Sequence, residues 1–234
     1  MKKAISGLIL LLFALTGLYP AGTLIAACFG YNFEVINVPV FSVIIALLSV
    51  CAVILDLVFK YVNESKPIQV LMVVIAPLSL LNAVFCIFEC PKIAVAVSAF
   101  VSFACCCFLT VKHGEPLVLK ALVLVLSGLM VLPISFLCFI ALIFGDFGKN
   151  TVTQTVESPS GKYYARVIDS DQGALGGDTF VDVYEKKGIN AIIFKIEKKP
   201  QRIYSGDWGE FEYMEIHWED DGCLMINSVE YEIE

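Results

Sequence analysis

The sequence predicts an α-helical transmembrane bundle of about five helices followed by a small all-β antiparallel sheet or sandwich domain. Hydrophobic residues make up 58% of the chain and charged residues only 17%, whereas soluble domains are about half apolar and a quarter charged. Residues 1–150 contain 8 Lys/Arg and 6 Asp/Glu, while residues 151–234 contain 8 and 17, a net charge of −9. Near residue 150 the long apolar runs also give way to alternation with a period of two. We therefore predict a multi-pass transmembrane domain over residues 1–148 and an acidic β-domain over residues 149–234.

Five apolar stretches make up most of the first domain. A helix of about 20 apolar residues crosses a bilayer core. Each stretch is close to that length and nearly free of charge, because an ionised group at the bilayer centre costs about 3 kcal/mol. The connections are short, so we expect sequential helices to pack antiparallel. The predicted helices are Ala4–Phe29, Val40–Phe59, Val70–Phe88, Ile93–Val111 and Leu117–Phe144.

The distribution of lysine predicts how the helices are oriented in the membrane. Cytoplasmic segments of membrane proteins carry an excess of Lys and Arg. With the N-terminus in the cytoplasm, the outer loops carry only Lys92, and the inner segments carry Lys2, Lys3, Lys60, Lys66 and Lys112. Five crossings then predict a multi-pass protein of the cell membrane with a cytoplasmic N-terminus and an extracytoplasmic C-terminal domain.

The end of the first apolar stretch allows two interpretations. Two lysines followed by a long apolar run also describe a secretory signal. The sequence Ile25-Ala26-Ala27-Cys28 fits the small-residue pattern after which bacterial lipoproteins are cleaved and lipidated on cysteine. The length of the run and the lack of a polar tether after Cys28 favour an uncleaved helix over a lipidated Cys28. Either alternative leaves the C-terminal domain outside the cytoplasm.

Polar residues within the spans predict packing roles. Asp56 can pair with Lys60 at i,i+4 near the cytoplasmic interface, and Asn82 can bond to a neighbouring helix. Seven of the nine cysteines lie within or at the ends of apolar runs, where cysteine packs as a small hydrophobe. Cys90 and Cys223 are both expected outside the cytoplasm, and the sequence does not fix whether they pair.

Alternating apolar and polar residues predict six or seven short strands in the second domain. The stretch "SPSGK" at its start could be mistaken for a phosphate-binding loop. Such a loop would read G-x-x-x-x-G-K-[ST] and precede a helix, whereas a strand follows here. Ser158–Gly161 is therefore predicted to be a hairpin turn. In the first predicted strand after this turn, Lys162 and Arg166 share the face opposite the apolar residues. In the second, Phe180, Asp182 and Tyr184 alternate with two valines.

The pattern of "SPSGKYYARV", a glycine-rich break, an Ile-Tyr pair and the hairpin "WEDDGCLMIN" resembles a small domain of unknown function in Gram-positive bacteria. That domain typically follows membrane helices or a lipoprotein signal. The matching part covers about residues 155–233. Ser160 stands where aspartate is common in such turns, which affects capping more than fold. The resemblance implies an extracytoplasmic β-domain and brings no activity, so no functional residue is carried over.

One polar cluster in the second domain raises the question of metal binding. Glu215, His217 and Glu219 project from one face of a predicted strand, and carboxylates with an imidazole are ligands for divalent ions. Alternate residues of a strand are about 6.6 Å apart, and an exposed strand face normally has this composition. We therefore expect these three residues to form a surface cluster that binds neither a metal nor a cofactor. An enzyme built around His217 is a weaker alternative, and no catalytic residue is predicted.

These expectations favour a binding role over catalysis. An acidic domain gains nothing from counterion release on nucleic acid, so we expect no nucleic-acid partner. The expected partners are the lipid bilayer and an envelope protein that the β-domain binds or senses. The alternative is an accessory subunit of a membrane transporter or channel, in which the helices do the work. For a transporter itself, the sequence lacks both several buried charges and two related halves with broken helices.

Overall fold

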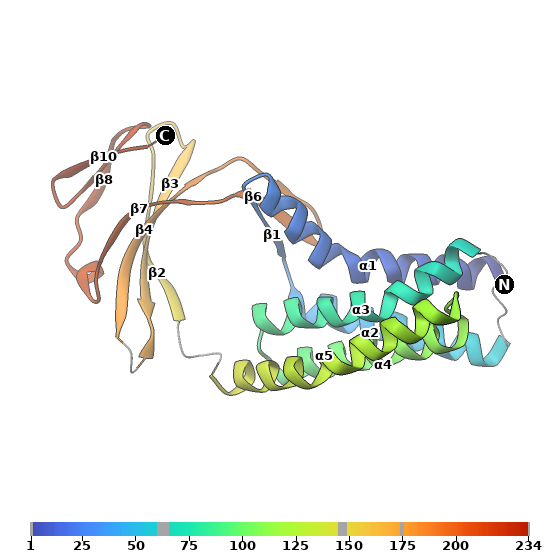
Figure 1. Cartoon of the computed structure of the whole chain (residues 1–234). Coiled ribbons are helices and arrows are strands. Elements are labelled where there is room, and N and C mark those ends of the chain that lie inside the picture. Colours follow the sequence, from blue (N-terminus) through green and yellow to red (C-terminus); the bar gives the residue numbers. More distant parts are fainter. Residues whose placement is uncertain (1, 60–65, 145–148, 174–175, 234) are drawn as a thin grey trace. The chain divides into compact units, whose positions relative to one another are not determined.

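A computed structural model describes residues 2–59, 66–144, 149–173 and 176–233 of the 234-residue chain (Figure 1). The chain forms two compact units. The first comprises Met1–Ile25 and Glu34–Gly145, and the second comprises Ala26–Phe33 and Asp146–Glu234. The boundary predicted at residue 148 falls just outside the described residues. The second unit therefore includes the last residues of the first helix and the short segment after it, in addition to the C-terminal domain.

Five long helices confirm the predicted bundle. Each is long and apolar enough to cross a membrane, so the chain has the composition of a multi-pass membrane protein. Three of the helices extend past the apolar runs into polar residues, because helical hydrogen bonding continues at their ends; these residues include Lys2 and Lys3, Lys66 and Glu89, and His113. The helices are α1 (Lys2–Cys28), α2 (Val38–Phe59), α3 (Lys66–Glu89), α4 (Ile93–His113) and α5 (Leu117–Phe144).

Helix α1 packs through a narrow seam. Its buried residues follow a spacing of four and three, which places them on one face of a helix. Close approach to α3 is possible because Gly17 has no side chain: a Cβ there would lie 3.2 Å from Leu78 of α3. The seam consists of Ile5, Ile9, Leu12, Thr16 and Tyr19.

Hydroxyl groups join the other helices inside the bundle. The Ser102 hydroxyl of α4 lies 3.1 Å from that of Ser49 on α2 and 3.4 Å from that of Ser79 on α3. Thr110 of α4 donates a 2.6 Å hydrogen bond to the carbonyl oxygen of Met72 on α3. Such bonds stabilise helix packing in lipid, where the hydrophobic effect between helices is weak. The amide oxygen of Asn82 is different: it has no partner among the described residues, so the bond predicted for Asn82 does not involve this atom.

A short strand follows α1 in a region that we predicted to be a loop. Gly30 has a φ of +77°, a conformation that glycine adopts without strain, and it turns the chain from α1 into β1 (Tyr31–Val35). Strand β1 belongs to a three-stranded sheet of order β1-β6-β5, with β5 at Gly188–Asn190 and β6 at Phe194–Lys198. The Phe33 ring stacks on that of Phe194 with 5.0 Å between centroids.

Two further antiparallel sheets form the sandwich of the C-terminal domain. One has the order β2-β3-β4-β7 and the other β10-β9-β8. Their facing side chains form one buried core, which includes Ala165, Val167, Val181 and Val183 from the first sheet and Ile216, Leu224 and Ile226 from the second. The strands are β2 (Lys149–Glu157), β3 (Tyr163–Asp171), β4 (Gly177–Glu185), β7 (Gln201–Asp207), β8 (Ile216–Asp220), β9 (Cys223–Ile226) and β10 (Val229–Glu232).

The predicted number of strands was too low. The described part of the C-terminal domain contains nine strands, because β2, β5 and β7 were not recognised. Strands β2 and β7 are the two edges of the four-stranded sheet. Edge strands are often polar, so "KNTVTQTVE" and "QRIYSGD" lack the apolar alternation that identifies a central strand. A 3₁₀ turn at Glu210–Glu212 follows β7.

The hairpin turn predicted at Ser158–Gly161 is confirmed. It connects β2 to β3, and Gly161, with a φ of +71°, donates a 2.8 Å hydrogen bond to the Ser158 carbonyl oxygen. The turn also contacts the β8–β9 turn, because the Ser160 amide donates a 3.1 Å hydrogen bond to Asp221. Hydrogen bonds from the Ser160 hydroxyl and amide lower the pKa of Asp221 below its usual value. This contact therefore joins the two sheets of the sandwich at one corner.

The contact between Ser160 and Asp221 predicts a specific pH dependence. A carboxylate whose pKa is lower in the folded state contributes stability at neutral pH, and that contribution is lost as the pH falls through the folded-state pKa. The stability lost between pH 6 and pH 3 should therefore be smaller in Asp221→Asn than in the wild type, and Ser160→Ala should reproduce part of the change. Urea unfolding of the full chain, followed by the fluorescence of its two tryptophans, Trp208 and Trp218, measures it. An unchanged pH dependence in both variants would contradict the assignment.

Candidate functional site

The outer face of the four-stranded sheet carries an ordered group of cationic and aromatic side chains. On β3 and β4 these residues alternate with the core residues, so they point away from the sandwich interior. We call this group the Arg–Tyr face. It consists of Tyr164, Arg166, Phe180, Asp182, Tyr184 and Arg202.

Two tyrosines and an arginine are stacked in the middle of the Arg–Tyr face. Tyr164 and Tyr184 are direct cross-strand neighbours, and their rings lie 5.0 Å apart with an interplanar angle of 4°. The guanidinium carbon of Arg166 lies 5.0 Å from the Tyr164 centroid and 4.9 Å from that of Tyr184. Attraction between a guanidinium and the aromatic rings holds all three side chains in one arrangement.

Arg202 forms the second half of the Arg–Tyr face. It donates two hydrogen bonds to the buried Asp182 carboxylate, from Nε at 2.8 Å and from a terminal nitrogen at 3.1 Å. Its guanidinium carbon also lies 3.6 Å from the Phe180 ring centroid. Asp182 faces Arg202 because the register of β4 and β7 shifts by one residue after Val181. The bidentate geometry fixes Arg202, although about half of its side chain remains exposed.

The two arginines differ in what they can offer to a partner. Arg202 is neutralised locally by Asp182. Arg166 lies opposite the same Asp182 in the strand register, but within the described part of the chain it forms no ion pair, and its guanidinium packs against the two tyrosine rings. Arginine and tyrosine are the residue types that carry most binding energy in protein interfaces, in part because they are already ordered before binding. The Arg–Tyr face is therefore suited to bind a carboxylate or phosphate beside an apolar group.

The speculative cluster of Glu215, His217 and Glu219 lies elsewhere in the domain. Glu215 precedes β8 and the other two residues are on it, and all three side chains are exposed. Among the described residues, no three His, Cys, Asp or Glu side chains are close enough together to hold a metal ion. Glu215, His217 and Glu219 are therefore not brought together as a metal site among the described residues.

Cys90, Cys223 and Cys28 are free thiols. Cys90 and Cys223 do not pair with each other. The Cys223 thiol lies 3.4 Å from a Glu230 carboxylate oxygen, and desolvation together with this carboxylate raises its pKa to about 11. Cys28 is the last residue of α1 and is exposed; its lipidation stays a prediction. In the Cys105–Cys107 triplet, only the central residue is buried.

A buried carboxylate lies at one end of the bundle. Asp56 of α2 is 1% exposed, and its two carboxylate oxygens contact Lys112 Nζ and His113 Nε2 of α4, each at 2.6 Å. The predicted partner, Lys60, is outside the described residues. No sequence pattern indicated His113 as a partner of Asp56, because His113 simply ends an apolar run. Only proximity between α2 and α4 could have revealed it.

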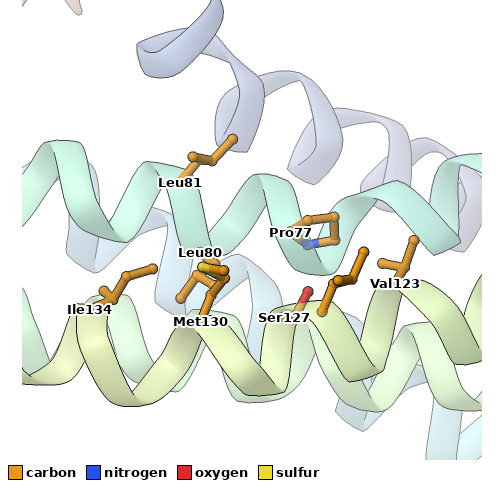
Figure 2. Close-up of a pocket in the computed structure, with 8 residues that line it drawn as sticks. Pro77, Leu80, Leu81, Val123, Ser127, Met130 and Ile134 are labelled. Carbon is orange, nitrogen blue, oxygen red and sulfur yellow. The ribbon is translucent and has the colours of Figure 1, made fainter.

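An apolar cavity of about 320 Å³ lies between α3 and α5 (Figure 2). Pro77 and Leu80 of α3 face Ser127, Met130 and Ile134 of α5 across it. Ser127 is 4% exposed, and its hydroxyl has no hydrogen-bond partner among the described residues. Figure 2 shows this hydroxyl directed into the space between the two helices. The volume and lining fit an acyl chain or another narrow apolar molecule with one hydrogen-bonding group.

Comparison with known proteins does not assign this chain to a family. No family model matches the chain, and neither the curated proteins nor the solved structures contain a significant match.

The Asp56 cluster predicts a large effect on the stability of the bundle. Removing one partner of a buried ion pair costs about 3–5 kcal/mol, and each kcal/mol lowers the midpoint of thermal unfolding by about 2–4 °C in a chain of this size. Asp56→Ala should therefore lower the midpoint in detergent by roughly 6 to 20 °C. Ser98→Ala is the control, because the Ser98 hydroxyl bonds only to a carbonyl of its own helix. Equal midpoints for the two variants would show that the cluster adds no stability.

Proposed function

We propose that this chain is a membrane-anchored binding protein whose β-sandwich lies outside the cytoplasm and docks an envelope protein through the Arg–Tyr face. The observation that carries the proposal is the stack of Arg166 on Tyr164 and Tyr184. It is ordered, it faces away from the sandwich core, and its cation has no carboxylate partner in the described chain. The helices serve as the anchor in this account.

The positions of the basic residues support the outward orientation. Lys112 and His113 meet Asp56 where α2 and α4 both end, and Lys120 of α5 donates a hydrogen bond to the Val111 carbonyl oxygen at the same end of α4. Lys92 precedes α4 and therefore lies at the opposite end. An excess of lysine at one end of a bundle favours the cytoplasm for that end. The chain beyond α5 then starts on the other side.

Charge indicates the chemistry of the partner. The net charge of −9 on residues 151–234 attracts a basic protein surface at long range and raises the rate of encounter. At the contact, Arg166 requires a carboxylate or phosphate, and the tyrosine rings require an apolar or aromatic side chain. We infer a partner with a largely basic surface that places one acidic and one apolar side chain against β3 and β4.

Photo-cross-linking from the Arg–Tyr face tests this function in intact cells. A photoreactive phenylalanine at Tyr184 of the full chain should give one discrete product with a second protein. The same residue at His217, which is exposed on the other sheet, should give several-fold less. Arg166→Ala should remove the Tyr184 product, while Arg166→Lys should retain part of it. Protease added to intact cells should digest the product.

Three results would overturn the proposal. Equal products from Tyr184 and His217 would show that the Arg–Tyr face is not a specific surface. A product that survives Arg166→Ala would exclude the cation as its determinant. Full protection from external protease would place the domain in the cytoplasm.

The bundle supports a second candidate, an accessory subunit of a membrane transporter or channel. The buried Asp56 cluster is the observation that favours it, because ionisable residues within membrane spans often mark functional sites. The cavity beside Ser127 offers a contact for an apolar ligand. In that case Asp56→Asn should change the flux of the associated transporter while Arg166→Ala leaves it unchanged. The reverse pattern would favour the binding protein.

A further inference from the structure

A basic segment interrupts the acidic C-terminal domain. The range 186–199 contains five lysines and a single acidic residue, Glu197, which gives a net charge of +4. The rest of residues 151–234 has a net charge of −13. This segment forms β5, a turn and β6, and we call it the β5–β6 hairpin. Its lysines are Lys186, Lys187, Lys195, Lys198 and Lys199.

Local ion pairs do not account for this concentration of charge. Lys186 lies 2.9 Å from a Glu157 oxygen, and Lys187 and Lys198 each lie 3.4 Å from oxygens of Glu185. The lysine side chains of these pairs are between 44% and 82% exposed. Exposed pairs of this kind contribute little to stability. Lys186, Lys187 and Lys198 therefore remain able to contact an anionic surface, whereas Lys195 is paired with Glu197 at 3.2 Å.

The sheet that contains the β5–β6 hairpin is amphipathic. Ile189 of β5 faces Ile196 of β6 in the strand register, and Phe194 lies two residues before Ile196 on the same face. Phe33 of β1 extends this apolar face by stacking on Phe194. The opposite face carries polar side chains, including the register pair Asn190 and Lys195.

The apolar side chains become more exposed toward the tip of the hairpin. Phe33 is 6% exposed, whereas Ile189 is 63% and Ile192 is 97% exposed. Ile193, beside the tip, is 42% exposed. Three exposed isoleucines within five residues, bordered by lysines, are unusual for a surface that faces only water. The same composition is typical of segments that lie in the interface of an anionic membrane.

Chain connectivity brings this sheet close to the lipid. Strand β1 is separated from α1 and from α2 by two residues on each side. Because α2 has 22 residues and about 20 are needed to cross the bilayer core, its first residue lies at the membrane boundary. Lys199 of the hairpin donates a 3.0 Å backbone hydrogen bond to Gly30. Neighbouring strands are about 4.8 Å apart, so β5 lies about 10 Å from β1 across the sheet.

We propose that the β5–β6 hairpin lies on the surface of the bilayer that the chain spans. Ile189, Ile192 and Ile193 enter the boundary between headgroups and acyl chains, and the lysines contact the phosphates of anionic phospholipids. This contact fixes the C-terminal domain close to the membrane. It depends neither on the Arg–Tyr face nor on which side of the membrane the domain occupies.

Fluorescence quenching by brominated lipid tests the proposal. The full chain is placed in nanodiscs that contain phosphatidylglycerol with brominated acyl chains. A tryptophan is added by substitution, and its quenching is obtained by subtracting the quenching of the native Trp208 and Trp218. Ile192→Trp should be quenched at least about two-fold more than Val229→Trp. Val229 is the control because it is a β-branched residue that is also exposed, at 54% against 97% for Ile192, and lies on β10 of the sandwich.

Lipid composition and charge reversal test the role of the lysines. Quenching of Ile192→Trp should fall in nanodiscs of brominated phosphatidylcholine, and also when Lys187→Glu and Lys199→Glu are added. Equal quenching of Ile192→Trp and Val229→Trp would overturn membrane contact, and it would indicate that the hairpin meets water or another protein. Quenching that changes with neither lipid nor charge would overturn the headgroup contact. Unchanged circular dichroism confirms that each variant is folded.

Discussion

Pairing between a strand near the N-terminus and the C-terminal domain is the constraint on which the rest of the structure depends. Strand β1 follows α1 directly, yet residues up to Phe33 form one compact unit with residues after Asp146. A folded unit cannot extend across a bilayer, because its backbone polar groups would have no partners in the lipid. The segment after α1 and the segment after α5 must therefore lie on the same side. Helices α2 to α5 satisfy this requirement by crossing four times.

The two units are stabilised by different forces. In the sandwich, burial of side chains such as Leu224, which is 0% exposed, provides the driving force. In the bundle, lipid covers the outer surface, so hydroxyl contacts at Ser102 and the charged contacts of Asp56 contribute specificity that apolar packing alone does not. The sheet β1-β6-β5 combines a strand that follows α1 in the chain with two strands of the C-terminal domain. Its β1 strand contributes the buried Phe33, and its β5–β6 hairpin carries the basic residues.

Local patterns in the sequence predicted much of the fold. Long apolar runs identified all five helices, and the alternation around Arg166 and Tyr184 identified the two central strands of the four-stranded sheet. Strand β1 was missed, although "YNFEV" alternates, because five residues between two helices are normally a loop. The candidate sites were largely missed for a different reason. The stack of Arg166 on two tyrosines depends on the register of β3 and β4, and the contact of Asp56 with His113 joins residues 57 positions apart. Neither contact can be recognised from a local pattern in the sequence.

Photo-cross-linking from Phe33 tests this central constraint most directly. A photoreactive phenylalanine at Phe33 replaces a ring that is stacked on Phe194, and mass spectrometry of the digested product identifies the attached segment. The structure predicts an adduct within Phe194–Lys198 of the same chain, formed in membranes before any extraction. Adducts found only with lipid, or with a segment outside the C-terminal domain, would contradict the pairing of β1 with β6 and the shared side that follows from it.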